Sequence, residues 1–148
     1  MDKNRQLIQL SEEGRFWRVD FEALSLAERV FRAIWELEGE VNNGGFDQYF
    51  FNSSGDTAFA VVDALKAIGA DSTAQILAAA NALFPGLSPP RDRDARQSLL
   101  AGFEPEQQAT LERLDQQFFL YPDNLTELLH DYVKRNSAEI SGATDVGI

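Results

Sequence analysis

Carboxylates at helical spacing are the residues of this sequence best suited to chemistry. Glu36 and Glu40 stand four positions apart, and the same spacing separates Asp123, Glu127 and Asp131. Residues four positions apart lie on one face of a helix, where like charges destabilise the helix by roughly 0.2–0.5 kcal/mol per pair. Lysines placed between them would remove this cost. The pattern therefore indicates either a negative surface that binds a basic partner or a merely solvated acidic face.

Few residues are available for other kinds of chemistry. The chain has no cysteine, which excludes disulfides and thiolate metal sites. The single histidine, His130, argues against multi-histidine metal sites and a Ser-His-Asp triad, and we interpret it as a partly exposed helical residue. The sequence motifs of nucleotide-binding loops, zinc proteases and serine hydrolases are absent. We therefore expect no catalytic residue, no metal and no cofactor.

Charge is unevenly distributed along the chain, whose formal net charge is −11. Residues 33–90 contain seven acidic residues and one lysine, and residues 97–131 contain seven acidic residues and one arginine. Residues 91–96, between them, are interpreted as a charged surface cluster. The electrostatic field of this excess negative charge would repel nucleic acid and anionic membranes and attract basic proteins. The side chains expected to form a partner-binding acidic surface are Glu36, Glu40, Asp47, Asp56, Glu112, Asp115, Asp123, Glu127 and Asp131.

Helices are predicted throughout, because every long apolar pattern repeats with a period near 3.6 residues and no strand alternation competes. Ser25 and Glu28 form a capping box for a first long helix that runs to about residues 39–42. Gly44 and Gly45 then redirect the chain, and Asp56 is expected to cap the helix that follows. The sequence predicts an all-α fold, a compact single-domain bundle of about six to seven helices. It would span residues 1–148, with residues 1–20 and 137–148 peripheral or frayed.

The most distinctive segment is residues 41–56, V-N-N-G-G-F-D-Q-Y-F-F-N-S-S-G-D. Phe46, Tyr49 and Phe50 have i, i+3, i+4 spacing, so we expect them to face the core. Gly44 and Gly45 allow an unusual backbone or a close helix contact. The polar residues either satisfy backbone groups at helix ends or line a ligand pocket. The members of such a pocket would be Glu38, Asn43, Gln48 and Asn52.

This segment resembles the signature E-x-x-x-N-N-G-G-F-x-Q-Y-F-x-N-x-x-G-D of a bacterial family of unknown function, some of whose members are described as DNA-mimic proteins. The resemblance extends over roughly residues 24–133 and includes residues 64–70, 76–85, 89–96 and 114–119. It implies an all-helical fold, a homodimer, no established catalytic residues and, in some members, mimicry of DNA. The residues that match the signature are Glu38, Asn42, Asn43, Gly44, Gly45, Phe46, Gln48, Tyr49, Phe50, Asn52, Gly55 and Asp56.

We therefore expect a non-enzymatic, acidic protein of the bacterial cytoplasm. It would bind a basic protein, such as a transcription factor or another DNA-binding protein, by presenting phosphate-like carboxylates. It would not itself bind nucleic acid, and no segment has the apolar character of a leader peptide or a membrane span. Two alternatives remain open. One is a small-ligand-binding or enzymatic role for the Asn-Gly-Gly-Phe segment, and the other is an interaction module unrelated to DNA.

Overall fold

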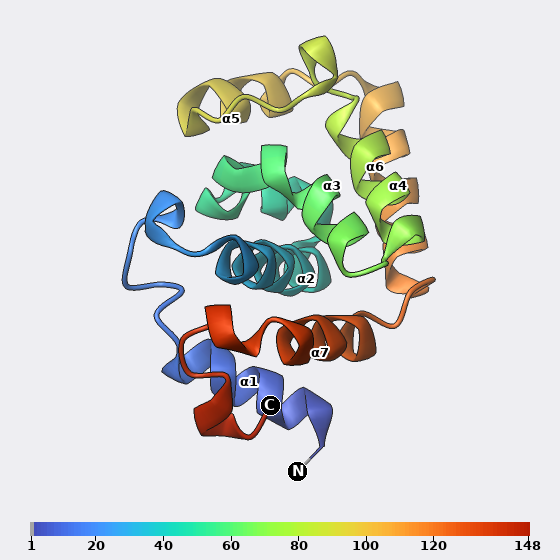
Figure 1. Ribbon diagram of the computed structural model, residues 1–148. Coiled ribbons are helices and arrows are strands. Elements are labelled where there is room, and N and C mark those ends of the chain that lie inside the picture. The colour runs from blue at the N-terminus through green and yellow to red at the C-terminus, as the bar shows by residue number, and fades with distance from the viewer. Residues whose placement is uncertain (1) are drawn as a thin grey trace.

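The computed structural model describes residues 2–148, and these residues form seven α-helices and several short 3-10 turns, without a β-strand (Figure 1). The prediction of an all-α fold is thus confirmed. None of the helices described is long and apolar enough to cross a membrane. The helices are α1 (Lys3–Glu13), α2 (Leu26–Phe51), α3 (Ala58–Ala67), α4 (Asp71–Asn81), α5 (Arg93–Ala101), α6 (Pro105–Phe119) and α7 (Leu125–Arg135).

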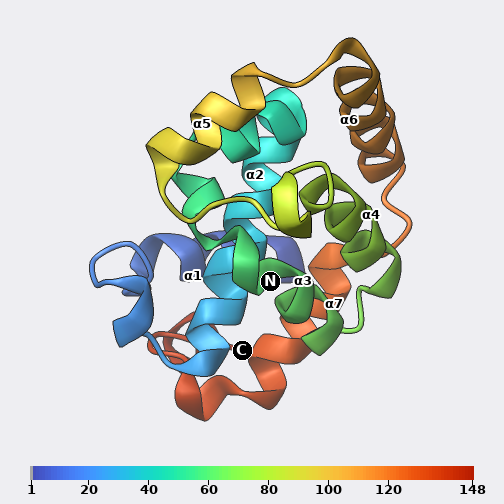
Figure 2. The same cartoon turned by 90° about the horizontal axis from the view of Figure 1, so that it is seen from above.

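The long helix α2 runs through the centre of the molecule, and the other helices pack around it. In Figures 1 and 2, α3 lies along one side of α2, whereas α7 lies on another side with α1 beneath it. Helices α4 and α6 pack against each other, and α5 covers the far end of α2. The apolar stripe of α2, including Phe31, Ile34, Leu37 and Val41, is fully buried, so this helix forms the middle of the core.

Capping chemistry fixes where α2 begins. The Ser25 hydroxyl accepts from the Glu28 N–H, and the Glu28 carboxylate accepts from the Ser25 N–H, as the capping box predicts. Glu28 is buried and also accepts from the guanidinium of Arg15 and the N–H of Ser141. Burial opposes ionisation, but these hydrogen bonds outweigh it and lower the pKa of Glu28 to about 2. The carboxylate thus joins both ends of the chain to the start of α2.

The segments expected to be peripheral or frayed, residues 1–20 and 137–148, pack against the rest of the molecule in the part that the structure describes. Helix α1 lies on α7 and buries Leu7 and Leu10. The C-terminal segment buries Ile140, Ala143 and Val146 against the same part of the molecule. Both segments lie at the periphery of the molecule, but their apolar side chains belong to the core (Figure 1).

Candidate partner-binding surface

Gly44 and Gly45 break α2 into two helical parts, as the sequence predicts. Gly45 has φ +74°, a left-handed conformation that disfavours residues with a side chain. A Cβ atom at Gly45 would also lie 2.5 Å from a carboxylate oxygen of Asp115. The other oxygen of Asp115 accepts from the Phe46 N–H at 2.8 Å. An acid of α6 therefore caps the second part of α2, and the glycine provides the room for it.

The aromatic residues after this break belong to the core. Phe46, Tyr49 and Phe50 are fully buried, which agrees with their helical spacing. Phe46 packs edge-on against Phe118 of α6, and Phe50 packs in the same way against Phe84 after α4. The second part of α2 is therefore an aromatic anchor that holds the surrounding helices together.

The polar residues of the signature form two hydrogen-bonded groups instead of one pocket. In the first group, Asn42 donates to the Tyr121 hydroxyl, which donates to Glu38, each at 2.6 Å. In the second group, the amides of Gln48 and Asn52 both donate to Glu40, at 2.6 and 3.2 Å. Asn43 is exposed. The structure therefore does not gather Glu38, Asn43, Gln48 and Asn52 around a common ligand.

The end of α2 is held by Arg96, a residue that sequence reasoning assigned to a surface cluster. Its side chain is fully buried. The guanidinium donates to the backbone carbonyls of Phe50 and Asn52 at 2.6 and 2.9 Å, and to the Asp56 carboxylate at 2.8 Å. Gly55 leaves the space for it, because a Cβ atom there would lie 2.6 Å from Arg96 Nε. The sequence did contain a signal for this burial. Arg96 lies four positions before the apolar Leu100 and therefore shares its helix face, and both residues are buried in α5.

Asp56 therefore does not cap α3, contrary to the expectation. Its carboxylate binds the guanidinium groups of Arg93 and Arg96, and the residue before α3 is Thr57, whose side chain makes no capping bond. Partial burial raises the pKa of Asp56, but the hydrogen bonds from the two arginines outweigh burial and hold the pKa below its usual range. Asp56 has an internal structural role.

Four further acids of the predicted surface also bond within the protein. Glu36 pairs with Arg32 at 2.9 Å, and Glu40 accepts from Gln48 and Asn52 as described. Asp115 caps the second part of α2. Asp123 precedes α7, which is capped by Asn124, so it does not share a helix face with Glu127 and Asp131. Its carboxylate instead accepts from the N–H and hydroxyl of Thr73 in the first turn of α4.

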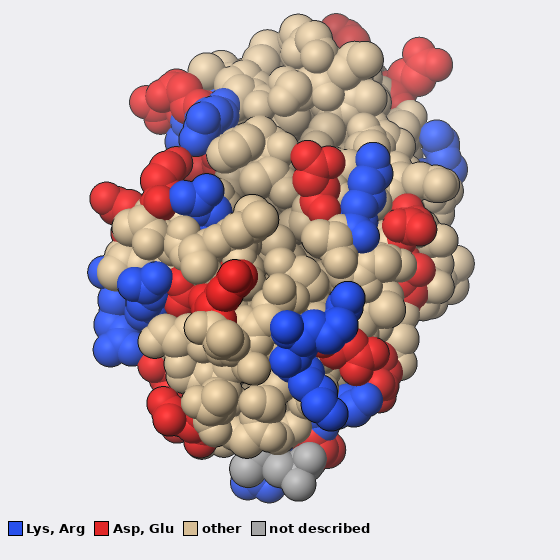
Figure 3. Space-filling model, viewed as in Figure 1, with Lys and Arg blue, Asp and Glu red and all other residues tan. Residues whose placement is uncertain are grey.

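Glu127 and Asp131 do lie on the outer face of α7, but the side chain of Lys3 lies beside them. The ammonium of Lys3 is 2.5 Å from Glu127 and 4.0 Å from Asp131. This contact joins α1 to α7 and partly neutralises the pair. Figure 3 shows the same mixing of signs over one face of the molecule, where acidic and basic residues alternate around uncharged areas. On that face the net charge does not form an unbroken negative surface.

Asp47 and Glu112 remain as the predicted surface acids that are exposed and form no ion pair or side-chain hydrogen bond within residues 2–148. Together with Asp115 they line a hollow of about 270 Å³ between α2, α5 and α6. We name this feature the acidic hollow. Its other lining residues are Leu100, Phe103, Gln108 and Leu111, so no basic side chain belongs to it.

The charges of Asp47 and Glu112 act on the carboxylate of Asp115. Partial burial raises the pKa of Asp115, the Phe46 N–H acts against this rise, and the charges of Asp47 and Glu112 add to it. Asp115 therefore lies in the negative field of Asp47 and Glu112. A cationic side chain placed here would relieve that repulsion, and its aliphatic stem would contact Leu100, Phe103 and Leu111.

Comparison with known proteins agrees with this architecture. Residues 22–136 match the model of the DMP19-like protein family. The match covers most of the chain and the whole of the segment described above, so the chain belongs to this family, and the resemblance to a DNA-mimic family is confirmed. No curated protein and no solved structure shows significant similarity to the chain.

Proposed function

We propose that this protein acts without catalysis, by binding a basic protein through the acidic hollow, and that it competes with DNA for that partner. The observation that carries the proposal is the group of three carboxylates Asp47, Glu112 and Asp115, which no basic side chain of the hollow neutralises. Membership of the DMP19-like family supports the reading as a DNA mimic.

The chemistry of the hollow fits lysine and arginine side chains. DNA-binding proteins carry such residues to neutralise phosphates, which follow one another at one charge per roughly 1.7 Å of duplex. Carboxylates held on rigid helices present the same sign of charge to the same residues. Asp115 is fixed by its bond to the Phe46 N–H, and Asp47 lies one position further along the helix that this bond caps. The negative groups are therefore positioned before the partner arrives, which reduces the entropy lost on binding.

The test compares two charge-matched double variants. In the first, Asp47→Asn and Glu112→Gln remove the exposed charges of the hollow. In the second, Glu12→Gln on α1 and Glu139→Gln in the C-terminal segment remove two exposed charges. In Figure 1, these segments lie at the other end of the molecule from α5. A basic partner purified from the host is titrated with each protein at low and at high salt, and then with labelled duplex DNA in competition.

The hollow variant should weaken partner binding by about three- to tenfold, because two exposed ion pairs are lost, whereas the control variant should change it less than about twofold. Binding of the unaltered protein should fall steeply as salt rises. A ternary complex of partner, DNA and this protein would refute mimicry. Equal effects of the two double variants would show that the hollow is not the contact site.

A further inference from the structure

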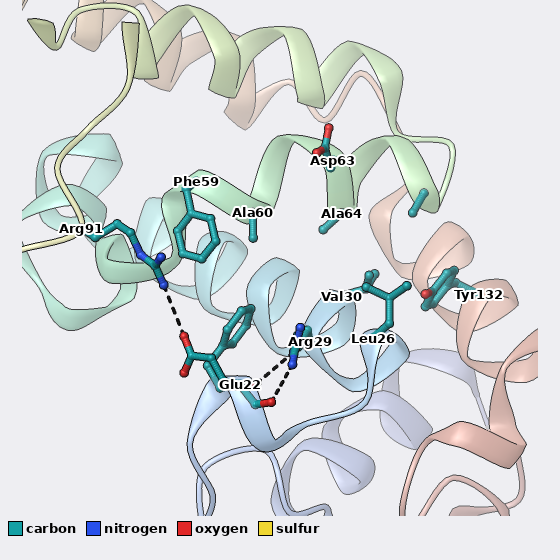
Figure 4. Close-up of a pocket in the computed structure, with 12 residues that line it drawn as sticks. Glu22, Leu26, Arg29, Val30, Phe59, Ala60, Asp63, Ala64, Arg91 and Tyr132 are labelled. Atoms are coloured by element: carbon teal, nitrogen blue, oxygen red, sulfur yellow. Dashed lines mark hydrogen bonds and ion pairs between the residues drawn. The ribbon is translucent and has the colours of Figure 1, made fainter. Parts of the chain in front are cut away.

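Charge distinguishes two further hollows of the surface. The apolar groove of about 590 Å³ between α2 and α3 is lined by side chains of both signs, which cancel (Figure 4). Its charged residues are Glu22, Arg29, Asp63 and Arg91. A smaller hollow of about 230 Å³ between α1, α2 and α7 is lined by one carboxylate and by no basic side chain. We name it the tryptophan hollow, because Trp35 lines it, and its charge favours a cation.

A chain of hydrogen bonds leaves free acceptors at the tryptophan hollow. The Tyr121 hydroxyl has one proton, which it donates to an oxygen of Glu38 at 2.6 Å. It must therefore accept from the amide nitrogen of Asn42, which is also 2.6 Å away. The carbonyl oxygen of Asn42 and the second oxygen of Glu38 form no hydrogen bond within residues 2–148. Because both residues line the hollow, it offers acceptors to a ligand that donates hydrogen bonds.

The remaining wall suits the carbon chain of a small amine. Leu7 and Leu129 are buried and line the hollow together with the partly buried Trp35. The Trp35 ring is held by stacking on Phe31, with the ring centroids 5.4 Å apart and 13° between the ring planes. An indole ring attracts an ammonium group, and the leucines shield the adjoining carbon atoms from water. Charge, acceptors and apolar surface are thus combined in one small hollow.

Gly39 leaves open space in the wall of the tryptophan hollow. It lies inside α2, where glycine destabilises a helix relative to alanine. Nothing lies within 4 Å of a Cβ atom at this position, so the packing of the fold does not require a glycine. The missing side chain instead keeps this part of the hollow accessible to a ligand.

We propose that the tryptophan hollow binds an alkylammonium group, with the cation at Glu38 and Asn42 and the carbon chain against Trp35 and the two leucines. A free alkylamine and a lysine side chain share this chemistry. The volume lies below the roughly 300 Å³ at which pockets for drug-sized ligands begin, so a ligand of few heavy atoms fits best. The tryptophan hollow shares no residue with the acidic hollow, and the inference does not rest on the function proposed there.

The probes are n-butylammonium chloride, its neutral analogue n-butanol and sodium butyrate, each titrated into the isotope-labelled protein at about pH 7 and about 100 mM NaCl, which screens unspecific attraction of cations. Nuclear magnetic resonance follows the amide of Gly39 and the indole N–H of Trp35, both in the tryptophan hollow. The indole of Trp17 is the internal control, because it donates to the Ser11 carbonyl and lies outside the hollow.

n-Butylammonium should bind saturably in the millimolar range, since a ligand of about five heavy atoms has little binding energy. It should shift the resonances of Gly39 and Trp35 and leave that of Trp17 in place. n-Butanol should bind about three- to fivefold more weakly, because it lacks the charge, and butyrate should not saturate the site.

Three variants test the residues of the hollow. Glu38→Gln, which can still accept from Tyr121, should weaken n-butylammonium binding about three- to fivefold. The charge-matched Glu106→Gln, exposed and outside the hollow, should leave it unchanged. Gly39→Leu should weaken it about tenfold by filling open space, while its denaturant midpoint should not decrease, since leucine favours a helix. This midpoint separates loss of binding from loss of folding.

N-acetyl-lysine amide identifies the source of the ammonium group. Tighter binding than that of n-butylammonium would assign the site to a lysine of a protein partner, and weaker binding would assign it to a free amine; both results agree with the proposal. Absence of a saturable shift, equal affinities for n-butylammonium and n-butanol, or equal effects of Glu38→Gln and Glu106→Gln would overturn it.

Discussion

His130, interpreted from the sequence as partly exposed, is buried, and its neighbours fix the tautomer of its ring. The Gln6 amide donates its N–H groups to the carbonyls of Val146 and Gly147, so its oxygen must accept from His130 Nε2 at 2.8 Å. The neutral ring therefore carries its proton on Nε2, and the buried Nδ1 has no hydrogen-bond partner within the residues described. A second proton would be placed on that unpartnered nitrogen.

Stability should fall as pH falls through the titration range of His130. Burial lowers its pKa, Lys3 and Lys134 lower it further, and Asp131 and Glu127 only partly oppose this. The unfolded chain, with a histidine pKa near 6.5, therefore binds more protons than the folded chain just below that pH. The contribution to the free energy of unfolding is complete above about pH 6.5 and declines as pH decreases toward the folded pKa.

The measurement is the denaturant midpoint at several pH values between about 5 and 8 for the unaltered protein and His130→Gln, which retains a donor toward Gln6. The histidine protein should lose more stability than the glutamine variant over the acidic part of this range. Parallel curves for the two proteins would show that the pKa of His130 is the same in the folded and unfolded chains and would contradict the lowered pKa described above.

At the scale of single elements, α2 offers a direct comparison of two glycines. Gly39→Ala should be neutral or stabilise the protein by about 0.5–1 kcal/mol, because nothing lies within 4 Å of a Cβ atom there and alanine favours the helix. Gly45→Ala should destabilise it by about 1–3 kcal/mol, since φ is +74° and Asp115 occupies the space. Urea unfolding of the two variants measures both effects. Similar midpoints would mean that Asp115 moves aside without loss of its cap.

The helices themselves could be predicted because their signals are local. The capping box at Ser25, the break at Gly44 and Gly45, and the aromatic spacing after it all involve residues within a few positions of one another. The capping partners could not be predicted in this way. Asp115 lies 69 positions from Phe46, Asp123 lies 50 positions from Thr73, and Arg96 lies 46 positions from Phe50.

Contacts between residues far apart in the sequence also explain why most acids of the predicted surface are engaged within the protein. Helical spacing correctly placed Glu127 and Asp131 on one face, but it gave no indication that Lys3 lies beside them. It also treated Asp123 as exposed, although its carboxylate caps another helix. A sequence shows which residues carry charge, whereas tertiary contacts decide which charges remain available to a partner. Asp47 and Glu112 could be separated from the other acids only in the folded chain.

For the whole molecule, salt should affect folding and binding in opposite directions. A net charge of −11 destabilises the compact state through self-repulsion, which salt screens, so the melting temperature should rise modestly between about 10 and 150 mM NaCl. Partner affinity should fall over the same range, because attraction between opposite charges is screened too. Calorimetry and a binding titration in matched buffers measure the two trends. If both quantities rise together, apolar contacts dominate the complex, and the charge serves mainly solubility.

Asp115 belongs at once to the fold and to the candidate site. One oxygen caps the aromatic part of α2, and the same carboxylate forms a wall of the acidic hollow. A cation that enters the hollow competes with the Phe46 N–H for this carboxylate and draws electron density away from that bond. By thermodynamic reciprocity, a bound cation weakens the hydrogen bond from the Phe46 N–H by the same coupling free energy by which that bond weakens cation binding. We therefore expect the amide resonance of Phe46 to shift when a cation enters the hollow, so that a group in the core would report on binding at the surface.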